Sequence, residues 1–374
     1  MGEKYKRTIG GPPLAGFAIA LILTGSAWAL LTLYEFIAFD LYPVREEPAL
    51  FTPYFLARSV FALIVSVALI GPLYRFAAPH SSLNTGQFDP MARSIAVGTM
   101  ILGLGCAALL LASPKMLMEM TQEDTLIEWA SALLLIIGSG CFVAEILRRI
   151  QSGTDSDWIA KIELAIAIGM ALLLFLIAME EISWAQRLFD FDTPDEIEQM
   201  NWQGEFNFHN LQTDLSETLY YTGVGFFLLV FPLMRETVFR GPEWFDRLLA
   251  FAPSRSVAAI SAPATMVYYG HWNLIPIQVT TFCALLAMLV YAGAAKKRHD
   301  RREFSLFLFL AAGVVFTQGI FLTYGYRMLE VGNASEFTEL FITIGLCWYG
   351  IDRFRSRCGH ARKPLRQGSE GIFE

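Results

Sequence analysis

The chain has 374 residues, of which 55% are hydrophobic and 17% are charged, and its mean hydropathy is +0.45. Soluble chains carry about a quarter charged residues, so this composition excludes an ordinary soluble globular protein. The net charge of −7 gives no electrostatic basis for binding nucleic acid, which excludes that class of partner.

Apolar runs near the length of a bilayer crossing recur along the whole chain. They are continuous rather than alternating, which favours transmembrane helices over a β-barrel. We therefore predict an all-α, polytopic helix bundle with about ten spans, forming a single integral membrane domain over residues 1–374. In chain order the predicted spans are 13–38, 54–77, 94–113, 128–147, 160–178, 218–234, 256–269, 274–295, 304–324 and 338–352.

The seventh predicted span, 256–269, is short and contains Pro263. A broken pair formed with the eighth span is the alternative interpretation of this region. The first apolar run has no small-residue cleavage site, so we expect it to be a retained helix rather than a removed signal peptide.

The distribution of Lys and Arg predicts the orientation. The N-terminal segment, the even-numbered connections and the tail 353–374 are basic, whereas the odd-numbered connections are acidic. Cytoplasmic loops of membrane proteins carry an excess of Lys and Arg. We therefore predict a multi-pass protein of the cell inner (plasma) membrane with both termini in the cytoplasm. The alternation of charge holds only if 256–269 crosses.

The connection 179–217, on the predicted outer side, begins with two consecutive acids, Glu180 and Glu181, directly after an apolar run. Ionisable groups at that depth usually face a cavity or one another. If the helix continues beyond them, Glu180, Trp184 and Arg187 share one face. A position in the aromatic belt at the membrane surface explains Trp184 and one acid, but not the pair.

Residues 201–209 read NWQGEFNFH, a strict alternation of polar and apolar side chains. Period two predicts an extended segment with one hydrogen-bonding face and one mostly aromatic face. Just before it, a capping-box pattern predicts a short surface helix over 194–200. Glu205 and His209 fall on one side in either a strand or a helix, and a carboxylate beside an imidazole suits acid–base chemistry or a metal. A hydrogen-bonded lid that seals the bundle is the alternative.

Other polar residues are expected at the same end of the bundle. His271, beside Trp272, is read as an interfacial residue or as a metal ligand. The full set of candidates follows from their chemistry. We expect Glu180, Glu181, Glu205 and His209 to be catalytic, Arg187, Gln203, Asn207, Arg327 and Glu339 to bind substrate, and Glu205, His209 and His271 to be the candidate ligands if the cofactor is a divalent metal.

The string EEISWAQR, followed by NWQGEFNFHNL, resembles the motif pair EEISWGQR and NxQxExNxHN of uncharacterised multi-pass bacterial membrane proteins. The match lies within residues 180–211, and Ala185 stands where the motif has glycine. This resemblance implies no activity, cofactor or substrate. The acid-and-histidine pattern also invites comparison with the alkaline ceramidase superfamily of seven-span metal hydrolases. The HxxxH pair of that superfamily is absent and the span count differs, so the chain is not assigned to it.

Three functions are compatible with the sequence. The first is an enzyme that acts on a membrane lipid or lipid-linked substrate at the outer leaflet. The second is a non-catalytic subunit or assembly partner of a membrane protein complex. The third is a transporter or ion pathway, which would need acids inside the spans; here the acids cluster at one rim.

Overall fold

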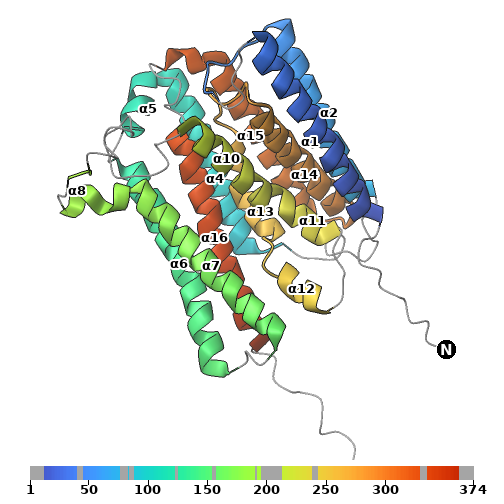
Figure 1. The fold of residues 1–374 in the computed structure, drawn as a ribbon, viewed down its shortest axis with the longest axis vertical. Helices are drawn as coiled ribbons and strands as arrows, with labels where there is room; N and C mark the ends of the chain where they lie inside the picture. Colours follow the sequence, from blue (N-terminus) through green and yellow to red (C-terminus); the bar gives the residue numbers. More distant parts are fainter. Residues whose placement is uncertain are drawn as a thin grey trace, which may run out of the picture.

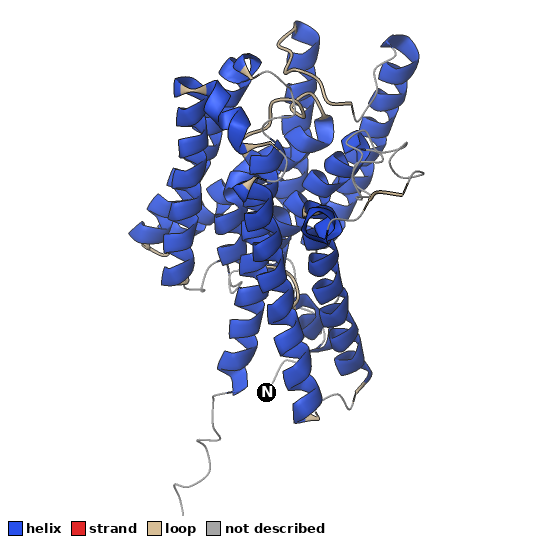
Figure 2. Cartoon of the chain, turned by 90° about the vertical axis from the view of Figure 1, so that its left-hand side faces the viewer, coloured by secondary structure: helices blue, strands red, loops and turns tan. Residues whose placement is uncertain are grey.

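The computed structural model describes residues 12–39, 45–75, 83, 88–122, 125–153, 157–189, 192–194, 213–237, 243–328 and 335–361. Every regular element in these segments is helical, and they contain no strand (Figure 2). Eight helices are long and apolar enough to cross a membrane. They are α1 (Pro12–Phe39), α2 (Pro53–Arg75), α4 (Pro90–Ala112), α6 (Leu126–Ser152), α7 (Trp158–Glu181), the continuous α10 (Thr213–Gly225), η3 (Phe226–Val230) and α11 (Phe231–Thr237), α14 (Ile275–Lys297), and α15 (Arg301–Tyr324) with η5 (Gly325–Arg327).

The remaining elements are one long helix and several short ones. The long helix, α16 (Ser335–Ala361), has 27 residues like α6 but is more polar, because Glu336, Glu339 and Asp352 interrupt its apolar run. The short elements are α5 (Pro114–Met120), η1 (Ser183–Ala185), α8 (Gln186–Phe189), α12 (Glu243–Leu249), α13 (Arg255–Ser261) and η4 (Ala262–Thr265). The prediction of an all-helical, multi-pass architecture is therefore confirmed.

The helices pack around α13, which lies in the middle of the bundle (Figure 1). On one side α13 packs against α16, α16 against α6, and α6 against α7. On the other side α13 packs against α4, followed by α15, α14, α2 and α1. The outermost helix, α1, exposes large apolar side chains, among them Ile22 at 67%, Leu30 at 69% and Ile37 at 74%. Such a surface is expected where a helix faces lipid rather than water.

Three aspartates determine where membrane helices begin. Asp89, Asp157 and Asp300 immediately precede α4, α7 and α15, and each accepts a hydrogen bond from a backbone N–H of the first turn, at 2.9, 2.6 and 3.0 Å respectively. These N–H groups have no partner within the helix, so the side chains satisfy them. The caps fix the starts of the helices at this end of the bundle.

The segment 256–269, predicted as a short span or as half of a broken pair with the eighth span, is not a continuous helix. The helix α13 ends at Ser261, η4 continues to Thr265, and turns follow up to α14. Pro263 lies in the first turn of η4, where its missing N–H and its ring prevent α13 from continuing as a regular helix.

The irregular part of this segment is nevertheless enclosed by protein. Every residue from 255 to 275 is buried. The backbone N–H of Tyr268 donates to Oε1 of Gln318 at 3.0 Å, and Nε2 of Gln318 donates to the carbonyl of Tyr268. Non-helical backbone at membrane depth is tolerated only where protein or water forms hydrogen bonds with its polar groups. Here Gln318 on α15 bonds both the N–H and the carbonyl of Tyr268.

The two ends of the bundle contain different charged residues. We call the end that holds Arg149, Arg255 and Arg353 the arginine end, and the end that holds Glu217 and His271 the histidine end. The helix α10 begins at the histidine end, and its continuation α11 finishes at the arginine end, where Glu236 lies 3.6 Å from Arg255.

Candidate functional site at the histidine end

Three segments that are far apart in the sequence meet at His271. The ring lies in the turns before α14, Glu217 lies on the first turns of α10, and Glu46 lies in the segment before α2. Nε2 of His271 is 2.8 Å from Oε2 of Glu217, and Nδ1 is 3.5 Å from Oε1 of Glu46. The imidazole is buried, with 4% of its side chain exposed, whereas the two carboxylates are 22% (Glu46) and 14% (Glu217) exposed. The ring therefore lies beneath two acids that reach the surface.

Backbone and amide hydrogen bonds hold this arrangement in place. The N–H of Glu47 donates to the carbonyl of Gly270 at 3.0 Å. Asn273 accepts from the N–H of Leu50 at 3.0 Å and donates to the carbonyl of Pro48 at 2.9 Å. These bonds join residues 47–50 to the residues on either side of His271, so the segment that follows Glu46 is fixed opposite the ring.

Aromatic side chains enclose the imidazole. The ring of Tyr221 lies edge-on to His271 at 5.2 Å between centroids, and Tyr268 lies at 6.5 Å in a similar geometry. Tyr221 is completely buried. Its hydroxyl donates to Oε1 of Glu339 at 2.7 Å, so one tyrosine contacts both the imidazole and an acid of α16.

Burial and charge shift the pKa values of the site in the same direction. Burial raises the pKa of the Glu46 carboxyl to about 7; His271 opposes the shift, and the carboxylates of Glu217 and Asp214 add to it. Burial alone would lower the pKa of His271, but contact with Glu217 and the charge of Glu46 outweigh it and raise that pKa above its ordinary value. Both shifts favour the protonated forms of the two groups.

A second group of acids lies beside this site. Glu181, the last residue of α7, interacts electrostatically with Glu339 on α16 and with Glu128 on α6. Glu336, one turn before Glu339, interacts with the same acids and with Glu217. Four helices thus contribute carboxylates to one end of the bundle. Within the described segments, neither Glu181 nor Glu336 forms an ion pair with Lys or Arg.

The helix α7 ends at Glu181, so the condition for a helical face shared by Glu180 and Arg187 is not met. Ser183, Trp184 and Ala185 have φ values of +44°, +56° and +59°, so the chain makes a left-handed turn before α8 begins. The turn removes the helical face that Glu180 was expected to share with Arg187. Glu180 still contacts Trp184, because the indole Nε1 donates to Oε1 of Glu180 at 2.6 Å.

The structure brings some of the predicted residues together and places one elsewhere. Glu181, Glu339 and His271 lie in the two adjoining acid groups. Arg327, predicted to bind substrate, donates from Nη1 to the carbonyls of Leu110 and Leu111 at the end of α4, at 3.4 and 2.9 Å. This is the contact expected of an arginine at a helix C-terminus.

Several predictions fall outside the described residues. They are the extended segment 201–209 with Gln203, Glu205, Asn207 and His209, the short helix expected over 194–200, and the side chain of Arg187. The predicted approach of Glu180 or Glu181 to Glu205 and His209 falls there as well.

Sequence reasoning missed Glu46 and Glu217 as site residues. Both lie in acidic stretches of the predicted outer side, where their charge was explained by orientation alone. The sequence offered only their positions near predicted helix starts: Glu217 directly precedes the start at 218, and Glu46 lies eight residues before the start at 54. No pattern in the chain links either residue to His271.

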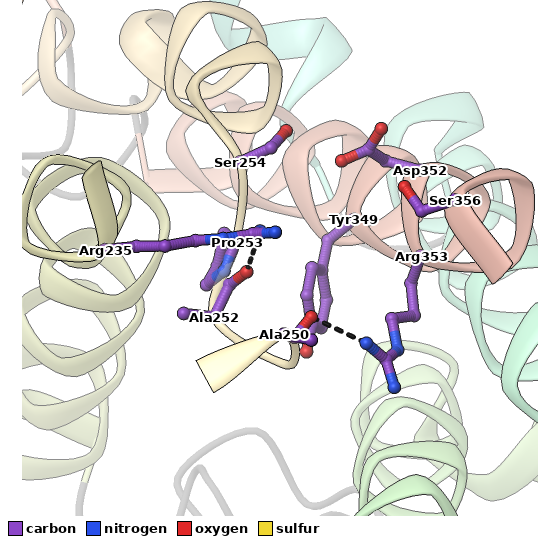
Figure 3. A pocket seen from close by; sticks show the side chains of 9 residues that line it. All are labelled: Arg235, Ala250, Ala252, Pro253, Ser254, Tyr349, Asp352, Arg353 and Ser356. Atoms are coloured by element: carbon purple, nitrogen blue, oxygen red, sulfur yellow. Dashed lines mark hydrogen bonds between the residues drawn. The ribbon is translucent and has the colours of Figure 1, made fainter. Parts of the chain in front are cut away.

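A cavity of about 250 Å³ lies at the arginine end and has a different character (Figure 3). Arg235 and Arg353 point into it, together with Asp352 and Tyr349. The guanidinium groups donate to the backbone carbonyls of the loop between α12 and α13, Arg235 to Ala252 and Arg353 to Ala250, each at 2.6 Å. Since both arginines are already bonded to the backbone of that loop, the cavity is a less suitable candidate for the functional site than the histidine end.

No protein-family model, curated protein or solved structure matches this chain. The functional assignment therefore depends on the site itself.

Proposed function

We propose that this is a plasma-membrane protein whose chain crosses the bilayer about ten times, with both termini in the cytoplasm and the histidine end outside. The eight apolar helices and α16 account for nine crossings. The buried segment 255–275 supports the tenth. One of its ends, Arg255, contacts Glu236 at the end of α11, and the other, His271, contacts Glu217 at the start of α10.

The charge distribution supports this orientation. Arg149, Arg255, Arg298 and Arg353 lie at the arginine end, and cytoplasmic surfaces are enriched in such residues. Reporter fusions at Gly153 and Gly204 test it: we expect them on opposite sides of the membrane, with Gly153 inside. Reporters on the same side would contradict the proposed layout.

We infer that the protein is an enzyme that acts on a lipid or lipid-linked substrate at the outer leaflet. The observation that supports this most is the buried imidazole of His271 between the carboxylates of Glu46 and Glu217. A histidine with a carboxylate close to each ring nitrogen is suited to proton transfer, and the partly exposed acids give it access from the surface. A substrate held in the membrane reaches this depth without leaving the bilayer.

Two alternatives make different demands on the site. An ion pathway requires titratable groups that continue through the bundle. At the arginine end, however, the buried acids Glu145, Glu163 and Glu303 are tied to arginines. An assembly subunit requires only that the histidine end binds a partner protein, and the acids at that end would form the contact.

Lipid turnover separates these functions. Purified protein is reconstituted into vesicles of total membrane lipid from its host, and the lipids are followed by mass spectrometry. We expect a product with the wild type and none with His271→Gln, which keeps an N–H donor but is a poor base. The matched control is His299→Asn, an exposed histidine with φ of +58°, a conformation that asparagine tolerates.

The other outcomes assign the alternatives. A stoichiometric protein partner that co-purifies with the wild type but not with His271→Gln, without lipid turnover, would favour the assembly subunit. Proton or ion flux into the vesicles, without turnover, would favour the pathway. Glu205→Gln and His209→Ala extend the test to the predicted outer segment, where loss of turnover in a stable protein would place them in the site.

A further inference from the structure

The donor atoms around His271 have the spacing of a metal site. One nitrogen of His271 and one carboxylate oxygen each from Glu46 and Glu217 lie within 4.8 Å of one another. Around a tetrahedral ion with donors about 2.1 Å away, neighbouring donors are separated by about 3.4 Å. Glu217 contacts Nε2 at 2.8 Å and Glu46 contacts Nδ1 at 3.5 Å, so an ion bound through one ring nitrogen requires one of the two carboxylates to move toward that nitrogen.

The direct contacts within the cluster are poorly satisfied without an ion. Nε2 of His271 and Oε1 of Glu46 are buried, yet neither takes part in a well-directed hydrogen bond. Oε2 of Glu217 lies 2.8 Å from Nε2, but the two atoms do not form a well-directed hydrogen bond. Buried polar groups are normally bonded, and an ion would give this nitrogen, in a residue that is 3% exposed, a well-directed partner.

The local charge also lacks compensation. Glu46 and Glu217 contact a single imidazole, and the charge of Asp214 acts on it as well. Within the described part of the chain, no Lys or Arg forms an ion pair with any of the three, and the nearby Arg45 contacts Glu47 instead, at 3.9 Å. A divalent cation supplies the missing positive charge without a change in packing.

We propose that Glu46, Glu217 and His271 bind a divalent transition-metal ion, of which Zn²⁺ and Mn²⁺ match one imidazole and two carboxylates best. Three protein ligands leave a coordination position for water or for an oxygen of a substrate. The inference deepens the proposed enzymatic function by naming its cofactor, but binding can be measured whether or not the protein turns over lipid.

Calorimetry on the full chain tests the site. Protein purified in detergent is stripped with EDTA, dialysed, and titrated with Zn²⁺ and separately with Mn²⁺. We expect one ion per chain with at least one of the two metals, and a higher thermal midpoint when the ion is bound. His271→Gln and Glu217→Gln, which keep size and hydrogen-bonding capacity, should weaken binding by about 100-fold or more.

Two control variants preserve the site. Glu47→Gln removes an acid adjacent to Glu46 whose side chain pairs with Arg45, and His299→Asn removes an imidazole at the arginine end. Both should bind the ion as the wild type does. No binding of either metal by the wild type, or equal binding by His271→Gln, would overturn the inference.

Failure of the metal site and failure of the enzymatic proposal are distinguishable. Metal binding without lipid turnover would support the metal site and contradict the enzymatic function. The opposite result is lipid turnover that depends on His271, persists in EDTA and occurs in protein that binds no metal. It would support a metal-free acid–base enzyme and contradict the metal site.

Discussion

Two acid clusters, one at each end of the bundle, are held in opposite ways; a separate buried acid, Glu35 on α1, pairs with Arg58 on α2 at 3.1 Å. At the arginine end, Glu145 contacts Arg149 at 2.9 Å and Arg353 at 3.1 Å, and all three side chains are at least 90% buried. At the histidine end, Glu217 contacts only an imidazole among the described charged groups. Acids with fixed counter-charges stabilise the packing of helices, whereas acids without them keep a charge available for a ligand, a proton or an ion.

The difference also separates the roles of the ends in the fold. The arginine end joins α6, α7, α12 and α16 through one network, since Glu163 on α7 contacts both Arg149 and Arg247. The turns around His271 are held by neutral hydrogen bonds, such as those of Asn273 to the backbone. These bonds do not depend on the charge of Glu46 or Glu217.

The largest loss of stability is expected from Glu303→Gln at the arginine end. Glu303 is completely buried and contacts Arg255 at 2.8 Å and Arg298 at 2.6 Å. Removing its charge leaves buried guanidinium groups under-compensated, which should lower the free energy of unfolding by about 3–5 kcal/mol. Denaturant unfolding in detergent measures it. Glu119→Gln, an exposed partner of Lys115, is the control and should change little. A loss below about 1 kcal/mol for Glu303→Gln would mean that the arginines are compensated elsewhere.

A smaller effect of opposite sign is expected from Ala185→Gly at the histidine end. Ala185 has φ of +59°, which is unfavourable for any residue with a Cβ and free for glycine. The variant should be more stable by about 1 kcal/mol. Ala178→Gly, in the regular part of α7, is the control and should be less stable by about 1 kcal/mol or more. The same sign for both variants would show that the left-handed turn is not a strained one.

The smallest effect is expected from Asp157→Asn at the exposed edge of the arginine end. Asparagine still caps α7, so only the attraction to Arg247, 2.7 Å away, is lost. Hydrogen bonding to Arg247 and to the backbone of α7 lowers the pKa of Asp157 below its ordinary 3.8. The stability it contributes is therefore present above that value and is lost as the pH falls through the folded pKa. Thermal midpoints of the two proteins should converge in acid and at high salt; a difference that persists in both would point to a role beyond charge.

Much of the fold could be predicted from the sequence, because hydropathy records which segments avoid water. The predicted spans at 13–38 and 304–324 correspond to helices Pro12–Phe39 and Arg301–Tyr324. Hydropathy does not record backbone conformation, so it did not reveal that α13 breaks at η4 inside a buried segment. Nor did it reveal the left-handed turn at Ser183–Ala185.

Less of the site could be predicted. The acids at Glu181 and Glu339 were recognisable because a charge beside an apolar run is unusual. Glu46 and Glu217 were not, because their pairing with His271 depends on how α10 packs against α14 and on the bonds between residues 47–50 and 270–273. Contacts of that kind between distant segments leave no trace in a single sequence.

The measurement that tests the central claim most directly is the unfolding free energy of Glu145→Gln and Glu217→Gln, the same substitution at the two ends, determined side by side in EDTA. We predict that Glu145→Gln loses about 3–5 kcal/mol because Arg149 and Arg353 lose their shared partner, while Glu217→Gln stays within about 1 kcal/mol of the wild type. Equal losses at both ends would contradict the account and make the histidine end a structural network like the arginine end.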